Sequence, residues 1–310
     1  MKEHHSGIHH ISVLAGDPQR NAEFYVHKLG LRMVKKSVNQ DDPGTYHLFY
    51  GNQEASPGAS LTFFPWPRAT KGEAGTGEAV TVSFTVPQNS LSYWQDHLND
   101  EGIETGVIFE RFGREFLPFE DPDGLNLELV FEDIPDESPS KREGTVPAKH
   151  AIRGFWGTKL RLTEAEATAE ILQDILGFKK SAEEDNLKLY TTDAPIGSAV
   201  IIEIAKPRSG KSGRGTVHHV AFRAADEEKL AAMRKKVQDQ GLRPTPIIDR
   251  HWFKSVYYRT PGGVLFEMAS DGPGYAVDED PEHLGEQLIL PPWLEEKRKQ
   301  IEKHLPKIEI

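Results

Sequence analysis

The two halves of this 310-residue chain repeat each other, and this repeat is the strongest constraint on its fold. The matched pairs are Gly30 and Gly177, Gly102 and Gly241, and Pro122 and Pro261, at offsets of 147, 139 and 139 residues. The glycines follow amphipathic segments, as helix C-caps do, and the prolines open Pro-x-Gly turns. Near-constant offsets predict two copies of one plan, each reading strand, helix, strands, helix, strands.

The repeat and the polar segments around it set the expected domain boundaries. We predict an N-terminal repeat domain over 1–134, a linker over 135–150 and a C-terminal repeat domain over 151–272. The first part of the linker is rich in proline, serine and charge, as linkers are. A tail over 273–310 is predicted to carry an amphipathic helix from Leu294 to Leu305 that packs back on the body.

Composition excludes several classes of protein. The chain has no cysteine, so disulfides and thiolate metal sites are excluded. No apolar run approaches the length of a membrane span, and the first residues lack the apolar core of a signal peptide. The net charge of −11 disfavours a nucleic-acid or anionic-membrane surface. We therefore expect a cytoplasmic protein without membrane or nucleic-acid partners, and a homo-oligomer is compatible with the sequence.

Two apolar, β-branched runs each contain a His-His pair, near the start of the chain and again about two hundred residues later. They are Ile8-His9-His10-Ile11-Ser12-Val13 and Val217-His218-His219-Val220-Ala221-Phe222. An unpaired imidazole in a strand core costs free energy, so histidines in such a place need a partner. Their recurrence in related contexts suggests one metal site built across a pseudo-symmetric fold.

The repeat, together with the segment from Asp249 to Glu267 and the later Leu290-Pro-Pro-Trp293, resembles a known family. It is similar to the vicinal oxygen chelate superfamily, which includes glyoxalase I and extradiol dioxygenases, and within it to the hydroquinone-type ring-cleaving dioxygenases. The resemblance implies an α+β fold of two tandem domains. Each domain would contain paired βαβββ modules whose curved mixed sheets form cups around a divalent metal.

Strand alternation indicates which side chains face such a cup. Ile11 and Val13 share one face with His9, and we expect a helix to cover that apolar face. His10 and Ser12 are then left toward the cup. The same argument directs His219 inward.

In the last strand of the repeat, alternation directs Glu267 inward, so three strands each offer one ligand-type side chain. Two neutral imidazoles and one carboxylate are typical of non-haem Fe(II) oxygenases, and the resemblance implies the same three metal ligands, His10, His219 and Glu267. Zn²⁺, Ni²⁺ or Mn²⁺ could occupy such a site in a crystal. The counterparts of these residues in the repeat, near Thr81 and Gly157, offer no imidazole, so the other cup is expected to hold no metal. The complete site then belongs to the C-terminal domain, and the first strand of the N-terminal domain is expected to contribute its third ligand.

The resemblance also matches Arg250 and Tyr257 to polar residues of the pocket, with catalytic roles; a surface ion pair and an ordinary strand position are the alternatives. It implies that His9 and His218 are catalytic hydrogen-bonding neighbours of the metal ligands, although both could simply flank the strands. Substrate contacts are expected from three residues, Ser12, Trp252 and Phe253.

These expectations favour an Fe(II)-dependent dioxygenase that takes a small aromatic diol with para-hydroxyls and O2. A glyoxalase-like isomerase or lyase of the same superfamily is the first alternative, although it normally needs a further basic ligand. A metal-free protein that sequesters an aromatic compound is the second.

Overall fold

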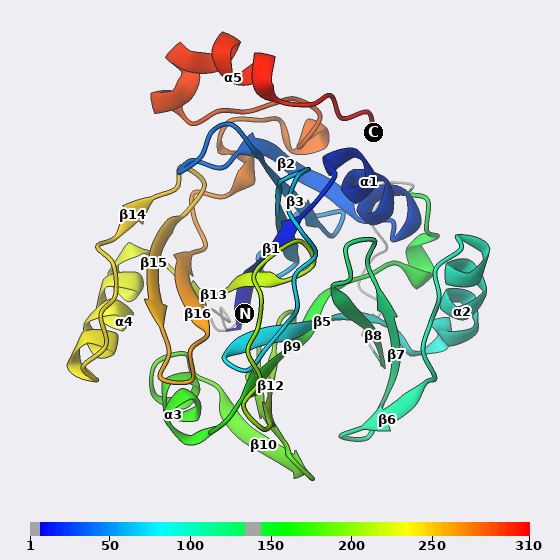
Figure 1. The fold of residues 1–310 in the computed structure, drawn as a ribbon, viewed down its shortest axis with the longest axis vertical. Coiled ribbons are helices and arrows are strands. Elements are labelled where there is room, and N and C mark those ends of the chain that lie inside the picture. The colour runs from blue at the N-terminus through cyan, green and yellow to red at the C-terminus, as the bar shows by residue number, and fades with distance from the viewer. Residues whose placement is uncertain (1–6, 134–143) are drawn as a thin grey trace.

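The computed structural model describes residues 7–133 and 144–310, which form two curved eight-stranded mixed sheets with few helices, as Figure 1 shows. The α+β class expected from the sequence is confirmed. In the first sheet the strand order is β14 (Ile248–Asp249), β15 (Lys254–Arg259), β16 (Leu265–Ser270), β13 (Val217–Ala224), β1 (Ile8–Ala15), β4 (Ser60–Pro65), β3 (Tyr46–Gly51) and β2 (Arg32–Val38). In the second sheet it is β10 (Lys179–Glu184), β11 (Leu187–Thr191), β12 (Ala199–Ile204), β9 (Gly154–Leu162), β5 (Glu78–Pro87), β8 (Asn126–Glu132), β7 (Arg114–Glu120) and β6 (Phe109–Arg111).

Helices follow the first strand of each four-strand module. They are α1 (Pro18–Ala22), which continues as the π-helical η1 (Glu23–Lys28), α2 (Leu91–Asp100) after the short η2 (Gln88–Ser90), α3 (Glu166–Asp174) and α4 (Glu227–Asp239). Shorter 3₁₀ segments are η3 (Ala148–His150), η4 (Tyr275–Val277), η5 (Pro281–His283) and η6 (Pro292–Lys297), and the last helix is α5 (Arg298–His304).

Each sheet joins one module from the first half of the chain to one from the second half. Strands β1–β4 share a sheet with β13–β16, whereas β5–β8 share a sheet with β9–β12. The two junctions are antiparallel pairs, β1 with β13 and β5 with β9. The predicted domains 1–134 and 151–272 therefore follow the sequence repeat rather than the sheets, and they stay a prediction. Most of the predicted linker, 135–143, lies outside the described residues.

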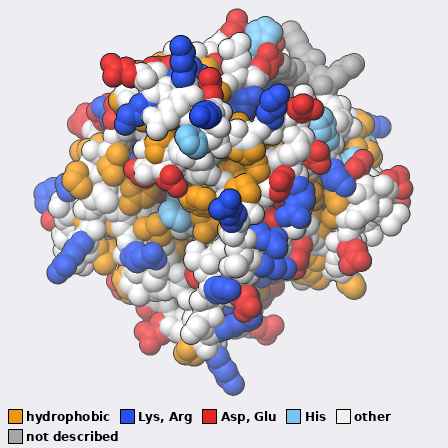
Figure 2. Space-filling model, turned by 45° about the horizontal axis from the view of Figure 1, so that its top comes forward, with side chains coloured by type: hydrophobic (Ala, Val, Ile, Leu, Met, Phe, Trp, Pro, Cys, Tyr) orange, Lys and Arg blue, Asp and Glu red, His pale blue; other side chains and the backbone are white. Residues whose placement is uncertain are grey.

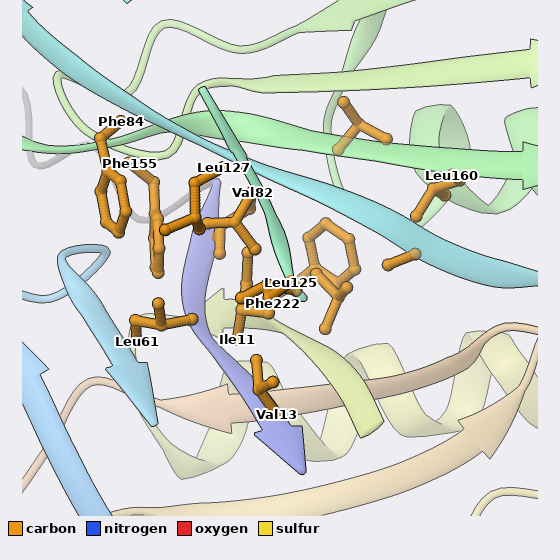
Figure 3. Close-up of a cluster of buried hydrophobic side chains, with 14 of the residues drawn as sticks. Ile11, Val13, Leu61, Val82, Phe84, Leu125, Leu127, Phe155, Leu160 and Phe222 are labelled. Carbon is orange, nitrogen blue, oxygen red and sulfur yellow. The ribbon is translucent and has the colours of Figure 1, made fainter. Parts of the chain in front are cut away.

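The apolar faces of the two sheets meet in the main core. Ile11 and Val13 of β1 belong to one buried cluster with Val82 and Phe84 of β5 and Phe155 of β9 (Figure 3). The expectation that a helix covers this face of β1 is therefore wrong for the centre of the sheet. Two sheets with complementary apolar faces bury each other there.

The tail returns to the first sheet, as the orange and red segment of Figure 1 shows. Leu290, Leu294 and Ile301 pack with Val38 of β2. The helical part starts with a 3₁₀ segment after Pro291, and α5 begins only at Arg298. Residues Tyr275 and Leu284 join a buried cluster on the concave side of the same sheet.

The outer surface carries both signs of charge. On the face drawn in Figure 2, acidic and basic side chains are interspersed with each other. None of the helices in the described part of the chain has both the length and the apolar character that crossing a membrane requires.

Candidate metal centre and substrate cavity

Three neighbouring strands of the first sheet bring His10, His219 and Glu267 together. Strands β1 and β16 flank β13, and their registers set both His10 and Glu267 opposite Ala221. His219 lies two residues before Ala221, on the same face of β13. Because the side chain of Ala221 is a single methyl group, it leaves space in which the larger groups around it converge.

The atoms that could bind an ion lie very close to one another. His10 Nε2 is 3.2 Å from His219 Nε2 and 3.3 Å from Glu267 Oε2, and His219 Nε2 is 2.8 Å from that oxygen. All three side chains are buried. In the described part of the chain, this is the group of histidine and acidic residues whose ligand atoms are close enough to share a metal ion.

The environment of Glu267 fits a divalent cation. Its Oε1 accepts a short hydrogen bond from Ser255, but no well-directed hydrogen bond reaches the buried Oε2 from the described residues, although His219 Nε2 is near. Burial opposes ionisation of this carboxyl, yet His10 and His219 outweigh burial and hold the pKa of Glu267 well below its usual range. An anionic oxygen and two imidazole nitrogens directed at one point are a donor set that a metal ion satisfies.

His9 and His218 each lie beside a triad histidine because of a β-bulge. The register shifts between Ile8 and His10 make His9 the extra residue on β1, and a second shift makes His218 the extra residue on β13. His9 Nδ1 is 2.9 Å from His10 Nδ1, and His218 Nδ1 is 2.8 Å from the Nδ1 of its neighbour. The expectation that His9 points to the face of Ile11 is therefore wrong, since a bulge interrupts strict alternation.

A cavity of about 330 Å³ opens beside the triad, which is within the size range of small-molecule sites. Its lining residues are His10, Asn39, Gln40, Asp41, His47, Phe49, Phe64, Trp66, His218, His219, Arg250, Trp252, Phe253, Tyr257 and Leu265. Trp252 and Phe253 thus form part of the wall, where the sequence placed them. Two larger hollows, of about 790 and 650 Å³, are lined by none of the triad residues.

Tyr257 and Arg250 also line this cavity. Tyr257 is paired in register with Glu267, and its ring centroid is 5.6 Å from that of His219. The Arg250 guanidinium lies 5.5 Å from the Tyr257 ring centroid and makes two hydrogen bonds, 3.2 and 2.9 Å long, to the carboxylate of Asp41. Arg250 therefore has both an ion pair and a place in the cavity wall. Burial raises the pKa of the Tyr257 phenol, so the hydroxyl is protonated at neutral pH.

Ser12 lies beneath the cavity instead of lining it. It is fully buried, and its Oγ is 2.7 Å from Oγ1 of Thr62 on β4. Thr62 Oγ1 is in turn 2.9 Å from Nε2 of His47, which does line the cavity. A direct contact between Ser12 and a substrate stays a prediction, and the structure places Thr62 and His47 between them.

Sequence reasoning missed Ser255 and His47. Ser255 lies two residues before Tyr257 on β15 and therefore shares its face, so strand alternation could have found it. His47 alternates on β3 with the core residues Tyr46 and Leu48. By alternation His47 shares a strand face with Phe49, so a histidine beside an aromatic residue was the available sequence signal.

Among the residues that the structure describes, the second sheet has no comparable group of ligands. At the position that corresponds to His10, a Cβ on Gly157 would lie 2.1 Å from the carbonyl oxygen of Ala199, so no side chain fits there. The counterpart of Glu267 is Glu128, whose Oε2 accepts hydrogen bonds of 2.8 Å from both Ser83 and Arg111. Glu128 is thus a buried, hydrogen-bonded carboxylate.

Comparison with known proteins agrees with this architecture. The model of the Glyoxalase/Bleomycin resistance protein/Dioxygenase superfamily matches residues 7–129 and 157–268. The chain belongs to this superfamily. The "Putative ring-cleaving dioxygenase MhqO" of Bacillus subtilis (strain 168) is 40% identical over 304 residues, which cover 98% of this chain and 97% of that protein. The chlorohydroquinone/hydroquinone 1,2-dioxygenase of Sphingobium indicum is 35% identical over 305 residues, 95% of this chain and 94% of its own length.

Solved structures extend the comparison to three dimensions. A crystal structure from Bacillus subtilis subsp. subtilis str. 168, described as a putative dioxygenase, is 39% identical with a TM-score of 0.94 and covers 98% of this chain and 97% of its own. Glyoxalase I from Zea mays, at 14% identity and a TM-score of 0.62, covers 86% of this chain and 92% of its own and shares the fold. The relatives that match over full length thus favour ring cleavage by an oxidoreductase.

Proposed function

We propose that this protein is an Fe(II)-dependent dioxygenase that cleaves aromatic rings carrying para-hydroxyls. The observation that carries the proposal is the convergence of His10, His219 and Glu267 beside a cavity walled by aromatic side chains. The hydroquinone dioxygenase among the relatives supports the substrate class. The predicted cytoplasmic location, and the homo-oligomer with which the sequence is compatible, are part of the same proposal.

The two imidazoles and the carboxylate would hold the metal through His10 Nε2, His219 Nε2 and Glu267 Oε2. Fe(II) held by these three residues would supply the redox chemistry that ring cleavage with O2 requires. Zn²⁺ or Ni²⁺ could replace it in a preparation because affinity for nitrogen and oxygen ligands rises along the divalent series, and the more weakly bound Mn²⁺ could enter where it is abundant.

The surrounding histidines would fix how the metal ligands bind. When a triad imidazole binds through Nε2, its Nδ1 carries the proton and donates to the Nδ1 of His9 or His218. Burial lowers the pKa of His9 to about 3, so this residue is neutral and can accept that hydrogen bond. Such outer partners orient the ring and increase its basicity toward a metal.

The cavity side chains would bind and orient the ring. Trp252, Phe253 and Phe49 offer flat apolar surfaces for an aromatic ring. The Tyr257 hydroxyl, protonated in its buried position, can donate a proton or a hydrogen bond to an oxygen beside Glu267. Arg250 can stabilise negative charge that develops on the substrate.

An oxygen electrode tests the proposal. Purified protein is stripped of metal, reloaded anaerobically with Fe(II), Zn²⁺ or Mn²⁺, and mixed with hydroquinones, catechols and methylglyoxal–glutathione. We expect oxygen consumption with hydroquinones in the Fe(II) sample, about one O2 per ring cleaved, and none in E267Q. Isomerisation of the thiohemiacetal without oxygen uptake would instead favour the glyoxalase-like activity, and tight binding of aromatics without metal would favour sequestration.

A further inference from the structure

His47 is a polar side chain of the cavity to which the proposed reaction assigns no role. It lies on β3, in the module that begins the chain, and its ring is packed between two phenylalanines. The centroid of the His47 ring is 3.9 Å from that of Phe49 and 4.2 Å from that of Phe64. These neighbours hold the imidazole in one orientation without using its hydrogen-bonding atoms.

Only one ring nitrogen of His47 is engaged within the described residues. Nε2 lies 2.9 Å from Thr62 Oγ1, which is itself held by Ser12 at 2.7 Å. Burial, with the charges of His10 and His219 as further causes, keeps the pKa of His47 well below its usual value. A neutral imidazole has one donor and one acceptor nitrogen, so one hydrogen-bonding site on the cavity side is left for a ligand.

Several other polar groups of the cavity wall already make protein contacts. Gln40 Nε2 donates to the backbone oxygen of Arg250, and Asp41 holds the guanidinium of that residue. Asn39 Oδ1 accepts from the backbone nitrogen atoms of Asp41 and Asp42. A ligand that displaced these contacts would lose as much as it gained, whereas a hydrogen bond to His47 displaces no protein contact.

His47 faces the triad from across the sheet. Strand β4 separates β3 from β1, so the two backbones are about 9–10 Å apart, twice the spacing of neighbouring strands. The curved sheet directs His10 and His47 into the same cavity. The cavity wall therefore carries ligand atoms for a metal, a hydrogen-bonding imidazole whose strand lies two places away in the sheet, and aromatic side chains.

We propose that His47 binds the second hydroxyl of a para-dihydroxy ring whose first hydroxyl lies at the triad. This role of His47 rests on the proposed function, and it would make His47 the residue that selects para-dihydroxy rings as substrates. A para-diol directs its two oxygens to opposite ends of the ring, which suits two polar groups that come from strands two places apart and line one cavity. A catechol or a simple phenol has no oxygen to offer His47 when bound in the same way.

Anaerobic calorimetry with the Fe(II)-loaded protein tests this role without turnover. The probes are hydroquinone and phenol, which share the ring and one hydroxyl and differ in the para-oxygen. We expect the wild-type protein to prefer hydroquinone by roughly 3- to 10-fold in Kd, the worth of one neutral hydrogen bond. In H47L that preference should disappear while the Kd for phenol and the metal content stay unchanged.

Two further variants keep the test decisive if H47L folds poorly. H47N keeps a hydrogen-bonding side chain and should retain part of the preference. T62V frees the His47 ring from its anchor and should reduce the preference without touching the ligand. The exposed His283→Leu serves as a control and should behave as wild type.

The outcomes separate the inference from the function on which it rests. If H47L, H47N and T62V all keep the full preference for hydroquinone, His47 does not bind the second hydroxyl, and the dioxygenase proposal stands. If the loaded wild-type protein binds neither compound, the proposed function and the role of His47 both fail.

Discussion

The two carboxylate oxygens of Glu267 have different neighbours. Oε1 is fixed by the Ser255 hydroxyl on the neighbouring strand, which leaves Oε2 for the two imidazoles. A related contact occurs in the second sheet, where Ser83 donates to Glu128, but there Arg111 replaces the imidazoles. The serine contact therefore orients a buried carboxylate, and the remaining neighbours decide what that carboxylate can bind.

Replacing Ser255 should weaken the metal centre. In S255A the carboxylate can rotate, and we expect a 10- to 100-fold loss of Fe(II) affinity, as for other outer partners of metal ligands. Competition with a fluorescent chelator measures it. The matched control is S83A in the other sheet, which should leave metal affinity unchanged; equal losses in the two variants would show that the effect is a general loss of stability.

Tyr257 should act on turnover and not on metal binding. In Y257F we expect normal metal content and a loss of roughly 10²–10⁴-fold in kcat, because a buried, protonated phenol is removed from the side of Glu267. Its neighbour Tyr258 points to the core, and no group in the described residues bonds its hydroxyl. Y258F is therefore the control and should turn over normally. An unchanged rate in Y257F would assign that tyrosine to packing alone.

At the scale of single elements, the two bulged strands explain why each His-His pair can act together. Apolar side chains of β1 recur at 8, 11 and 13, and those of β13 at 217, 220 and 222, with the bulge in the three-residue step. Each bulge adds one residue, so both imidazoles of a pair meet on the concave side. The two strands then pair with each other, which brings both His pairs to one site.

Metal removal should loosen β1 in particular. His10 ties this N-terminal strand to ligands on β13 and β16, and a ligand that binds only the folded state stabilises it by about 4 kcal/mol at a thousandfold excess over its Kd. With a chelator we expect a lower Tm and faster hydrogen exchange at Ile8–Ala15. Strand β9, which holds the corresponding place in the second sheet, is the internal control and should exchange at an unchanged rate. Equal acceleration in both strands would argue against a metal at this site.

Over the whole molecule, the tail closes the concave side of the first sheet and holds the cavity wall. Asp278 accepts hydrogen bonds from His251 Nε2 and Trp252 Nε1, 2.8 and 2.9 Å long, with one carboxylate oxygen. Its other oxygen is 2.6 Å from the Nζ of Lys35, a fully buried lysine of β2 that also pairs with Glu279. A segment outside the repeat thus links the first module to the aromatic wall contributed by the last.

D278N should affect both stability and substrate binding. Lys35 keeps Glu279, so we expect a loss of about 1–3 kcal/mol in the free energy of unfolding rather than the full cost of an unpaired buried charge. Asparagine has one acceptor oxygen where aspartate has two, so Lys35 competes for it with Trp252 and His251. Trp252 is then held less firmly, and KM should rise more than kcat falls. The control is D280N, whose carboxylate caps an exposed turn of the same tail. Denaturant unfolding measures the loss of stability, and steady-state kinetics measure KM and kcat. A D278N protein with the wild-type KM would show that the tail does not support substrate binding.

Sequence repeats and strand alternation were enough to predict the secondary-structure elements of this protein. The repeat gave the order of strands and helices, and alternation in the last strand selected Glu267 for the concave face. The same alternation misplaced His9, because a bulge changes the phase by one residue. The spacing of Ile8, Ile11 and Val13 is compatible with a bulge, but the bulge can be identified only when the register with the partner strand is known.

The sequence by itself determined that the two halves repeat, which residues bear ligand atoms, and that the one complete set of three needs the first strand beside late strands of the second half. The tertiary structure decided the full pairing of the sheet: β1–β4 joins β13–β16 across the chain, not the module that follows it. It also placed His47 and Asp278 around the cavity. Periodicity reports how a segment divides its faces between core and surface, whereas pairing depends on which strand edges meet, and those edges come from residues more than two hundred positions apart.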